Sequence, residues 1–287
     1  MERIAHGYGL VEAPVYSADH GLLFSDVLVG GVYAVDHTGD VRTIFERRRG
    51  IGGIALHEAG GLIVSGRNIS YKPFDGGSTQ TVLDRDPDAG NVGYNDLTTD
   101  AAGRIYAGSL GASPVFDDGR EPAPGALHLI DLDGSSRIVA TDISLTNGLG
   151  FSPDGRLLYH ADSRIQTVWV YDVEADGNLS EKRPFAKTDP GSPDGLAVAE
   201  DGSVWVAVAG GGIVAVFEPD GTARAPLTVP QAMVTSVCFG GSELRHLYIV
   251  TGSEGSDGDK EGSVFVEPVE VPGLPVVPAR VRLPDGA

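Results

Sequence analysis

Apolar and polar positions along the chain form a unit that recurs: an apolar stretch, an acidic turn that contains glycine, and a strongly apolar stretch. One unit spans residues 149–159, and similar units lie at 54–64, 97–107 and 196–206. Short apolar runs bounded by turn residues are typical of strands, and Asp-Gly pairs supply the positive φ that tight hairpins need. The pattern therefore predicts a series of antiparallel β-hairpins.

Each hairpin belongs to a longer repeat. A third apolar strand usually follows, as at 31–36 and 126–131, and a poorer fourth strand follows a second acidic turn, as at 41–45. The repeats have equivalent points near residues 12, 52, 95, 147, 194 and 235, at intervals of 40 to 52 residues. Repeats of this length with four strands each are typical of propeller blades.

We therefore expect an all-β fold, a six-bladed β-propeller with four antiparallel strands per blade, in which 1–287 is a single domain. A β-sandwich is the alternative, but six repeats of this length argue against it. The strand within 1–10 is expected to pair with the last blade, because an open ring would expose an edge strand. The Pro- and Gly-rich stretch 111–125 is a candidate lid loop, with a surface loop as the alternative. We expect 268–287 to be an extended C-terminal segment.

Charge narrows the set of partners. The chain has 40 Asp and Glu residues against 21 Lys and Arg residues, which gives a net charge of −19. A surface this acidic repels phosphate backbones and anionic membranes, so neither nucleic acid nor a membrane is an expected partner. The longest apolar stretch, 204–217, is interrupted by three glycines and is too short for a membrane span.

Cysteine usage and the first residues indicate the compartment. Cys238 is the only cysteine, which excludes an internal disulfide and a cysteine-based zinc site. Residues 1–7 lack the apolar core of a signal peptide. These features indicate a soluble, cytoplasmic protein and leave its oligomeric state open.

Four polar residues stand at equivalent points of their repeats: Glu12, Asn95, Asn147 and Asp194. Asn-Gly and Asp-Gly pairs are also strong hairpin signals, but the residues before Asp194 have the composition of a loop rather than a strand. The innermost strand of every propeller blade runs along the axis. We therefore expect these four side chains to converge at one mouth of the central channel.

Such a convergence would suit a cation. Two carboxylates that meet repel each other, and a cation relieves the repulsion. Oxygen ligands favour Ca²⁺, with Zn²⁺, Mg²⁺ or Mn²⁺ as alternatives. Because Ca²⁺ takes about six to eight oxygens, four side chains leave positions for water and substrate. The motifs thus predict one divalent cation at a catalytic site.

The same motifs resemble those of a known family. The matching segments are the Glu-x-Pro start at 12–14, Phe24-Ser25-Asp26, Tyr94-Asn95-Asp96, the run 147–155 and the run 193–198. Their order and spacing are similar to those of the gluconolactonase/regucalcin (senescence marker protein, luciferin-regenerating enzyme) family. The resemblance covers almost the whole chain.

The resemblance implies a six-bladed propeller with one divalent metal at the channel mouth. Residue by residue, it implies that Glu12, Asn147 and Asp194 are metal ligands and that Asn95 contacts the substrate. Family members commonly hydrolyse lactones of sugar acids, and relatives of the same architecture hydrolyse organophosphates. We therefore expect a metal-dependent lactonase that acts on a small-molecule lactone or ester, with Asp194 as the general base for the attacking water. The alternatives are a phosphotriesterase-like hydrolase and a non-catalytic calcium-binding propeller.

Gly93 departs from the family pattern. Sugar-lactonase members tend to carry Arg at this position, two residues before Asn95, and an Arg holds hydroxyls or carboxylates with several donors. Its absence predicts more space and lower polarity here, and so a bulkier or more apolar substrate than a simple aldonolactone. The alternative is that a side chain from 111–125 compensates.

Overall fold

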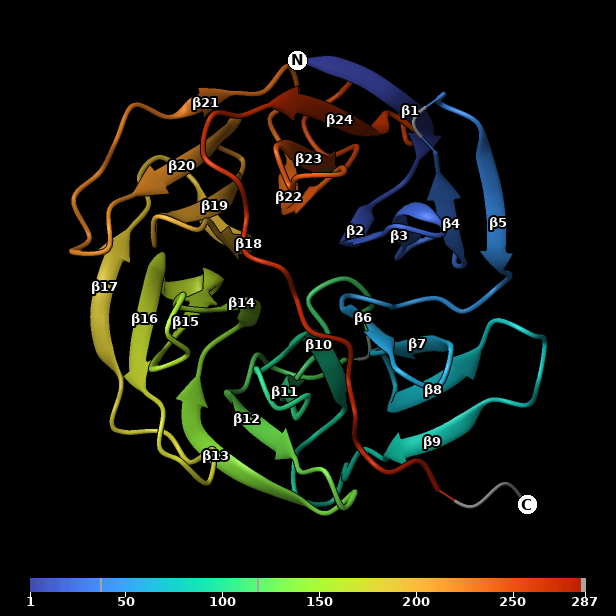
Figure 1. The fold of residues 1–287 in the computed structure, drawn as a ribbon, viewed down its shortest axis with the longest axis vertical. Coiled ribbons are helices and arrows are strands. Elements are labelled where there is room, and N and C mark those ends of the chain that lie inside the picture. Colours follow the sequence, from blue (N-terminus) through green and yellow to red (C-terminus); the bar gives the residue numbers. More distant parts are fainter. Residues whose placement is uncertain (37, 118, 285–287) are drawn as a thin grey trace.

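A computed structural model describes residues 1–36, 38–117 and 119–284. Six four-stranded antiparallel sheets surround one axis (Figure 1). The architecture confirms the six-bladed propeller that the repeats predict. Among the described residues the only helix is the short 3-10 helix η1 (Ser163–Ile165), and none could cross a membrane.

The strands of the first three blades are β2 (Val11–Ser17), β3 (Gly21–Asp26), β4 (Val32–Val35) and β5 (Val41–Phe45); β6 (Ile54–His57), β7 (Gly61–Val64), β8 (Ile69–Pro73) and β9 (Gln80–Leu83); and β10 (Gly93–Thr99), β11 (Ile105–Leu110), β12 (Gly125–Ile130) and β13 (Ser136–Ile143). The strands of the fourth and fifth blades are β14 (Thr146–Phe151), β15 (Leu157–Asp162), β16 (Thr167–Asp172) and β17 (Arg183–Lys187); and β18 (Ser192–Val198), β19 (Val204–Ala209), β20 (Ile213–Phe217) and β21 (Leu227–Thr228).

The sixth blade joins the two ends of the chain. It contains β22 (Val234–Gly240), β23 (His246–Thr251) and β24 (Gly262–Pro268), and its outer strand is β1 (Glu2–Tyr8). β1 pairs antiparallel with β24, with Ala5 opposite Val264. The ring therefore cannot open without breaking this strand pairing.

The core is divided among the blade interfaces. The described residues form six buried apolar clusters, one between each pair of neighbouring blades. Leu23 and Ile54, for example, pack together between the first two blades, and Tyr159 and Val204 between the fourth and fifth. Each sheet is thus apolar on both faces, which explains why the second strand of each repeat is so strongly apolar. This packing holds the innermost strands in place.

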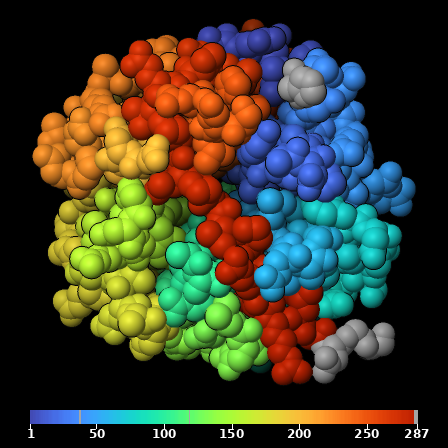
Figure 2. All heavy atoms as spheres, in the orientation of Figure 1, coloured from blue at the N-terminus to red at the C-terminus, as the bar shows by residue number. Residues whose placement is uncertain are grey.

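The C-terminal residues 269–284 cross one face of the ring as an extended segment, coloured red in Figures 1 and 2. Gly273 bridges to Ala199 of the fifth blade, and Ala279 bridges to His57 of the second. Residues 274–277 help to line a cavity of about 450 Å³ with the far ends of the inner strands. The segment therefore covers one end of the propeller axis, and the other end is open to solvent.

At that other end the innermost strands are irregular. The strand register shifts between Glu12 and Val15 in β2, and at the equivalent places in β10, β14 and β18. A β-bulge of this kind redirects a side chain. In β2 the bulge places Ala13 at φ 55°, a left-handed conformation that is rare for a residue with a Cβ. The bulges coincide with the four polar positions at the repeat starts.

The glycines at these bulges allow neighbouring strands to pack closely and do not form turns. A Cβ on Gly148 would lie 2.3 Å from the Leu196 backbone nitrogen of the next blade, and one on Gly195 would lie 1.9 Å from Ser236 Oγ. Neither glycine has a positive φ, so neither pair forms the hairpin turn that its dipeptide could also indicate. The bare backbone instead lets neighbouring inner strands touch.

We expect Gly148→Ala to lower the free energy of unfolding by about 3 kcal/mol, because its methyl group would meet backbone that cannot move aside. Urea unfolding of the variant and the parent protein measures the loss. Gly258→Ala is the matched control, since a Cβ there would first meet only the side chain of Glu261, at 3.2 Å. Equal stabilities for the two variants would contradict the packing role of Gly148.

Candidate active site

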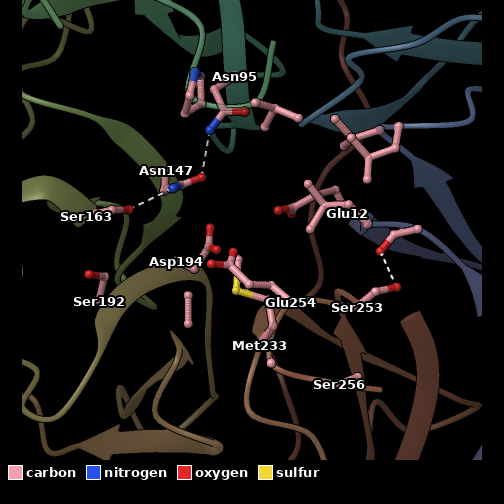
Figure 3. A pocket seen from close by; sticks show the side chains of 18 of the residues that line it. Glu12, Asn95, Asn147, Ser163, Ser192, Asp194, Met233, Ser253, Glu254 and Ser256 are labelled. Carbon is pink, nitrogen blue, oxygen red and sulfur yellow. Dashed lines mark hydrogen bonds between the residues drawn. The ribbon is translucent and has the colours of Figure 1, made fainter. Parts of the chain in front are cut away.

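The four polar residues at the repeat starts line one cavity of about 870 Å³ at the open end of the axis. Glu12, Asn95, Asn147 and Asp194 come from four different blades and point toward a common space (Figure 3). The structure thus brings together all four residues that the sequence singles out. Their roles as ligands, base or substrate contact stay predictions.

A hydrogen-bond network links three of these blades. Asn95 Nδ2 donates to Asn147 Oδ1 over 2.7 Å and to the Thr146 carbonyl over 2.8 Å. Asn147 Nδ2 donates to Ser163 Oγ over 2.7 Å, and Ser163 Oγ donates to the Pro193 carbonyl over 2.6 Å. The network fixes both amide planes, so that Asn147 Oδ1 faces Asn95 at the cavity (Figure 3).

Ser163 is a site residue that the sequence did not reveal. It lies in η1, directly after β15, and its hydroxyl joins the fourth blade to the backbone beside Asp194. A lone serine after a strand forms no recognisable motif. Its contact with Asn147 exists only because the fold brings 147, 163 and 193 together.

Two of the carboxylates that line the cavity, Glu12 and Asp194, have no positively charged partner among the described residues. Removal from solvent raises the pKa of Glu12 well above its ordinary value, and the charges of Asp194 and Asp96 raise it further. Removal from solvent likewise raises the pKa of Asp194, with Asp96 adding to the effect. Asp194 Oδ1 is buried and has no hydrogen-bond partner among the described residues. Each of these features disfavours the negative charge that the two groups would carry in water.

The residues present fit a divalent cation. Glu12 and Asp194 provide carboxylate oxygens, Asn147 provides an amide oxygen, and the unpartnered Asp194 Oδ1 is available to a ligand. The described residues contain no group of three His, Cys, Asp or Glu side chains arranged to hold a metal. A mixed carboxylate and amide set without nitrogen or sulfur suits a hard cation such as Ca²⁺ better than Zn²⁺.

Asp96 adds a further carboxylate beneath the site. Its side chain lines the second cavity, toward the covered end of the axis. Burial raises the pKa of Asp96 to about 7, although its carboxylate accepts a hydrogen bond from the Leu97 amide. The sequence places Asp96 in the same motif as Asn95 but does not reveal its electrostatic effect on Glu12 and Asp194.

A buried pair supports Asn95 from behind. Thr146 Oγ1 and His160 Nε2 lie 2.8 Å apart, and both side chains are buried. Burial lowers the pKa of His160 to about 3, so this imidazole is neutral at physiological pH. A Cβ on Gly108 would lie 1.9 Å from Thr146 Oγ1, so the bare backbone of β11 leaves just enough room for Thr146. The pair holds the carbonyl that receives the Asn95 amide.

The space expected at Gly93 is not there. Gly93 does not line the cavity, and a Cβ on it would lie 2.8 Å from the Gly66 carbonyl oxygen. Gly66 and Tyr94 exchange backbone hydrogen bonds of 3.1 and 2.7 Å. The interpretation that losing an Arg opens room at this position is therefore wrong, because neighbouring backbone closes it.

Apolar side chains form much of the cavity wall. They include Leu10, Leu28, Leu145 and Met233, which lie in segments that connect the strands. Pro114 and Val115, from the stretch 111–125, line the cavity as well. The adjoining Phe116 ring lies 4.9 Å from the Arg49 guanidinium, which ties this stretch to the segment between the first two blades.

Fold and cavity together define a six-bladed propeller with an oxygen-lined site at the mouth of its channel. The chain belongs to the SMP-30/gluconolactonase/LRE-like family, whose model matches residues 10–253. It is 32% identical over 276 residues to a 6-deoxy-6-sulfogluconolactonase of Pseudomonas putida, covering 92% of each chain. It is 30% identical over 289 residues to pentonolactonase XacC of Haloferax volcanii, covering 96% of each chain. The structure of a luciferin-regenerating enzyme matches with a TM-score of 0.86 at 23% identity, over 98% of this chain and 99% of that one, which shows the shared fold.

The raised carboxylate pKa values predict how stability depends on pH without a cation. The folded protein keeps a proton on Asp96 up to about pH 7, whereas an unfolded Asp loses it near pH 4. The stability that this protonated carboxyl contributes is therefore fully present below about pH 4 and is lost as pH rises through 7. In EDTA we expect the unfolding midpoint to be roughly 5–10 °C lower at pH 8 than at pH 5.5.

Thermal scans at both pH values measure this difference. Asp96→Asn should reduce it, which separates the local effect from the repulsion of the whole acidic surface. Added Ca²⁺ should raise the midpoint more at pH 8 than at pH 5.5, because a cation competes with protons for Glu12 and Asp194. A midpoint in EDTA that does not depend on pH would contradict the burial of these groups.

We expect Thr146→Val, which keeps the shape of the side chain, to lower the free energy of unfolding by about 1–3 kcal/mol, because His160 Nε2 would be left buried without a partner. Urea unfolding measures the loss. Thr141→Val, at an exposed strand position, is the control and should change stability by less than about 0.5 kcal/mol. If both variants match the parent protein, the Thr146–His160 contact does not stabilise the fold.

Proposed function

We propose that the protein is a divalent-cation-dependent hydrolase that opens a lactone ring. The observation that carries this proposal is the pair Glu12 and Asp194, with Asp194 Oδ1 unpartnered in a cavity beside the paired amides of Asn95 and Asn147. The activities for which the two relatives are named support a lactone as the substrate.

In this proposal Glu12, Asn147 and Asp194 hold the cation, and Ca²⁺ is favoured because all three offer hard oxygen donors. When bound, the cation polarises the lactone carbonyl and stabilises the negative charge that develops on its oxygen. Glu12 mainly anchors it. Asn147 contributes a neutral oxygen whose orientation is set by Ser163 and Asn95.

Asp194 is the proposed general base. Its carboxylate takes a proton from the attacking water while the water oxygen bonds to the carbonyl carbon. The ring C–O bond then breaks, and the departing ring oxygen receives that proton, so the product is the open hydroxy acid. In the cation-free protein burial raises the pKa of Asp194, and a bound cation would oppose that shift and favour the ionised carboxylate that a base requires.

Asn95 is the proposed substrate contact, and the network decides which of its atoms is free. Both hydrogens on Nδ2 are engaged, one with the Thr146 carbonyl and one with Asn147 Oδ1. The amide oxygen is left to accept a hydrogen bond, so Asn95 would hold a hydroxyl of the substrate.

The size of the cavity, about 870 Å³, supports a lactone that is bulkier than a simple aldonolactone. The acidic surface supports a small-molecule substrate rather than nucleic acid or membrane. A cytoplasmic location is part of the proposal and rests on the single cysteine.

Asp194→Asn should lower kcat for lactone hydrolysis by at least about 10³-fold, because the amide cannot accept the proton. Proton release from a panel of lactones, followed in a pH-stat with Ca²⁺ and with EDTA, measures this, and EDTA should stop turnover by the parent protein. Asp220→Asn, which changes an aspartate in an exposed turn, should keep parental rates.

Three results would redirect the proposal. Asp194→Asn with parental rates would refute the base assignment. Cleavage of phosphotriesters but of no lactone would indicate the phosphotriesterase alternative. Tight Ca²⁺ binding without turnover of any ester would indicate a calcium-binding propeller.

A further inference from the structure

One cationic side chain lines the cavity. Arg164 is the only Lys or Arg among the described residues that surround it, and none of them is a His. The position from which an arginine would be expected, Gly93, is closed by backbone. The cavity thus has its guanidinium on a different blade from the one that the family pattern suggests.

The backbone directly before Arg164 is held against the site by hydrogen bonds of Asp162 and Ser163. Arg164 lies in η1, next to Ser163, whose amide donates to the Leu145 carbonyl over 3.0 Å. The Asp162 carboxylate, directly before η1, accepts the amides of Ser144 and Leu145 over 2.9 and 2.8 Å. Because the Ser163 hydroxyl also contacts Asn147, Arg164 is anchored one residue from the network at the proposed reaction centre.

The guanidinium of Arg164 has no partner in the part of the chain that the structure describes. Several other arginines of this acidic chain form ion pairs with carboxylates, for example Arg104 with Asp100 and Arg224 with Asp201. Within the described residues Arg164 makes no hydrogen bond, ion pair or ring contact, and it is exposed. An unpaired arginine at the edge of a binding cavity, in a chain with 40 acidic residues, is available for a ligand.

The negative charges around the cavity leave the Arg164 guanidinium as the place where an anionic group of a ligand can bind. Glu254, Asp257 and Asp259 line the same cavity, yet none of them pairs with Arg164. Carboxylates there repel an anion that lies anywhere else in the cavity. A planar guanidinium with five donors can bind a carboxylate, sulfonate or phosphate through two parallel hydrogen bonds.

We propose that Arg164 binds an anionic substituent of the substrate, so that the preferred substrates are lactones that carry a carboxylate, sulfonate or phosphate group. The inference rests on the proposed lactonase function. In it Arg164 sets specificity, while Glu12, Asn147 and Asp194 provide the chemistry that charged and neutral lactones share.

The test compares lactones that differ in one substituent. Glucono-δ-lactone is the neutral probe, and its 6-phosphate, its 6-carboxylate analogue and its 6-deoxy-6-sulfonate are the charged ones. The parent protein should show a higher kcat/KM for at least one charged probe than for the neutral one. Arg164→Gln should lower kcat/KM for that probe by about 10- to 100-fold, mainly through KM, and by no more than about threefold for the neutral probe. Arg164→Lys should recover part of the loss.

Arg3→Gln is the matched control. Arg3 is exposed in β1, makes no ion pair among the described residues and does not line the cavity. Its replacement changes the net charge by the same amount, so an effect of Arg164→Gln that Arg3→Gln lacks is local. Equal losses for charged and neutral probes in Arg164→Gln, or no loss for either, would overturn the inference.

A binding measurement separates this inference from the proposed function. Calorimetric titration of Asp194→Asn with the charged probes, with and without Arg164→Gln, reports binding in the absence of turnover. Failure of the parent protein to hydrolyse any lactone refutes the proposed function. Loss of charged-probe binding in the double variant would still support an anion site at Arg164, and unchanged binding would refute it.

Discussion

Two carboxylates enclosed in one cavity, Glu12 and Asp194, are the constraint around which the rest of the structure is arranged. Like charges withdrawn from water are unfavourable unless a proton or a cation neutralises them. Burial raises the pKa of both groups above their ordinary values, so each carboxyl holds a proton to a higher pH than a free one does. A divalent cation relieves the repulsion and leaves the carboxylates charged. The bulged inner strands and the bare glycines between them hold the two groups in this arrangement.

The site is shared among separate blades. Glu12 comes from the first, the Asn95 amide from the third, Asn147 from the fourth and Asp194 from the fifth. Hydrogen bonds join the last three through Ser163, and buried packing joins every blade to its neighbours. Closure of the ring by β1 and β24 is therefore needed for the geometry of the site as well as for stability.

The residues proposed for catalysis and those proposed for selectivity lie in different parts of the fold. The groups proposed for catalysis lie on innermost strands that are packed on both faces. Much of the cavity wall comes from connecting segments: Pro114 and Val115, the acidic loop 253–259, and η1 with Arg164. Connecting segments tolerate change better than packed strands. A propeller can thus keep the proposed centre on its inner strands while its connecting segments change which substrates it binds. In this chain the guanidinium at the cavity lies on η1, and backbone closes the space beside Gly93.

The sequence by itself determined the repeat, the number of blades and the four side chains at the cavity, because a regular period places equivalent residues at equivalent points around an axis. Only the tertiary structure decided how those residues are supported. Ser163 and His160 reach the site through contacts with residues remote in the chain, and no local pattern records such contacts. The closure of Gly93 and the role of Gly148 likewise depend on how closely a second stretch of backbone approaches. Packing between blades sets that distance. The order of apolar and polar residues along one chain does not reveal it.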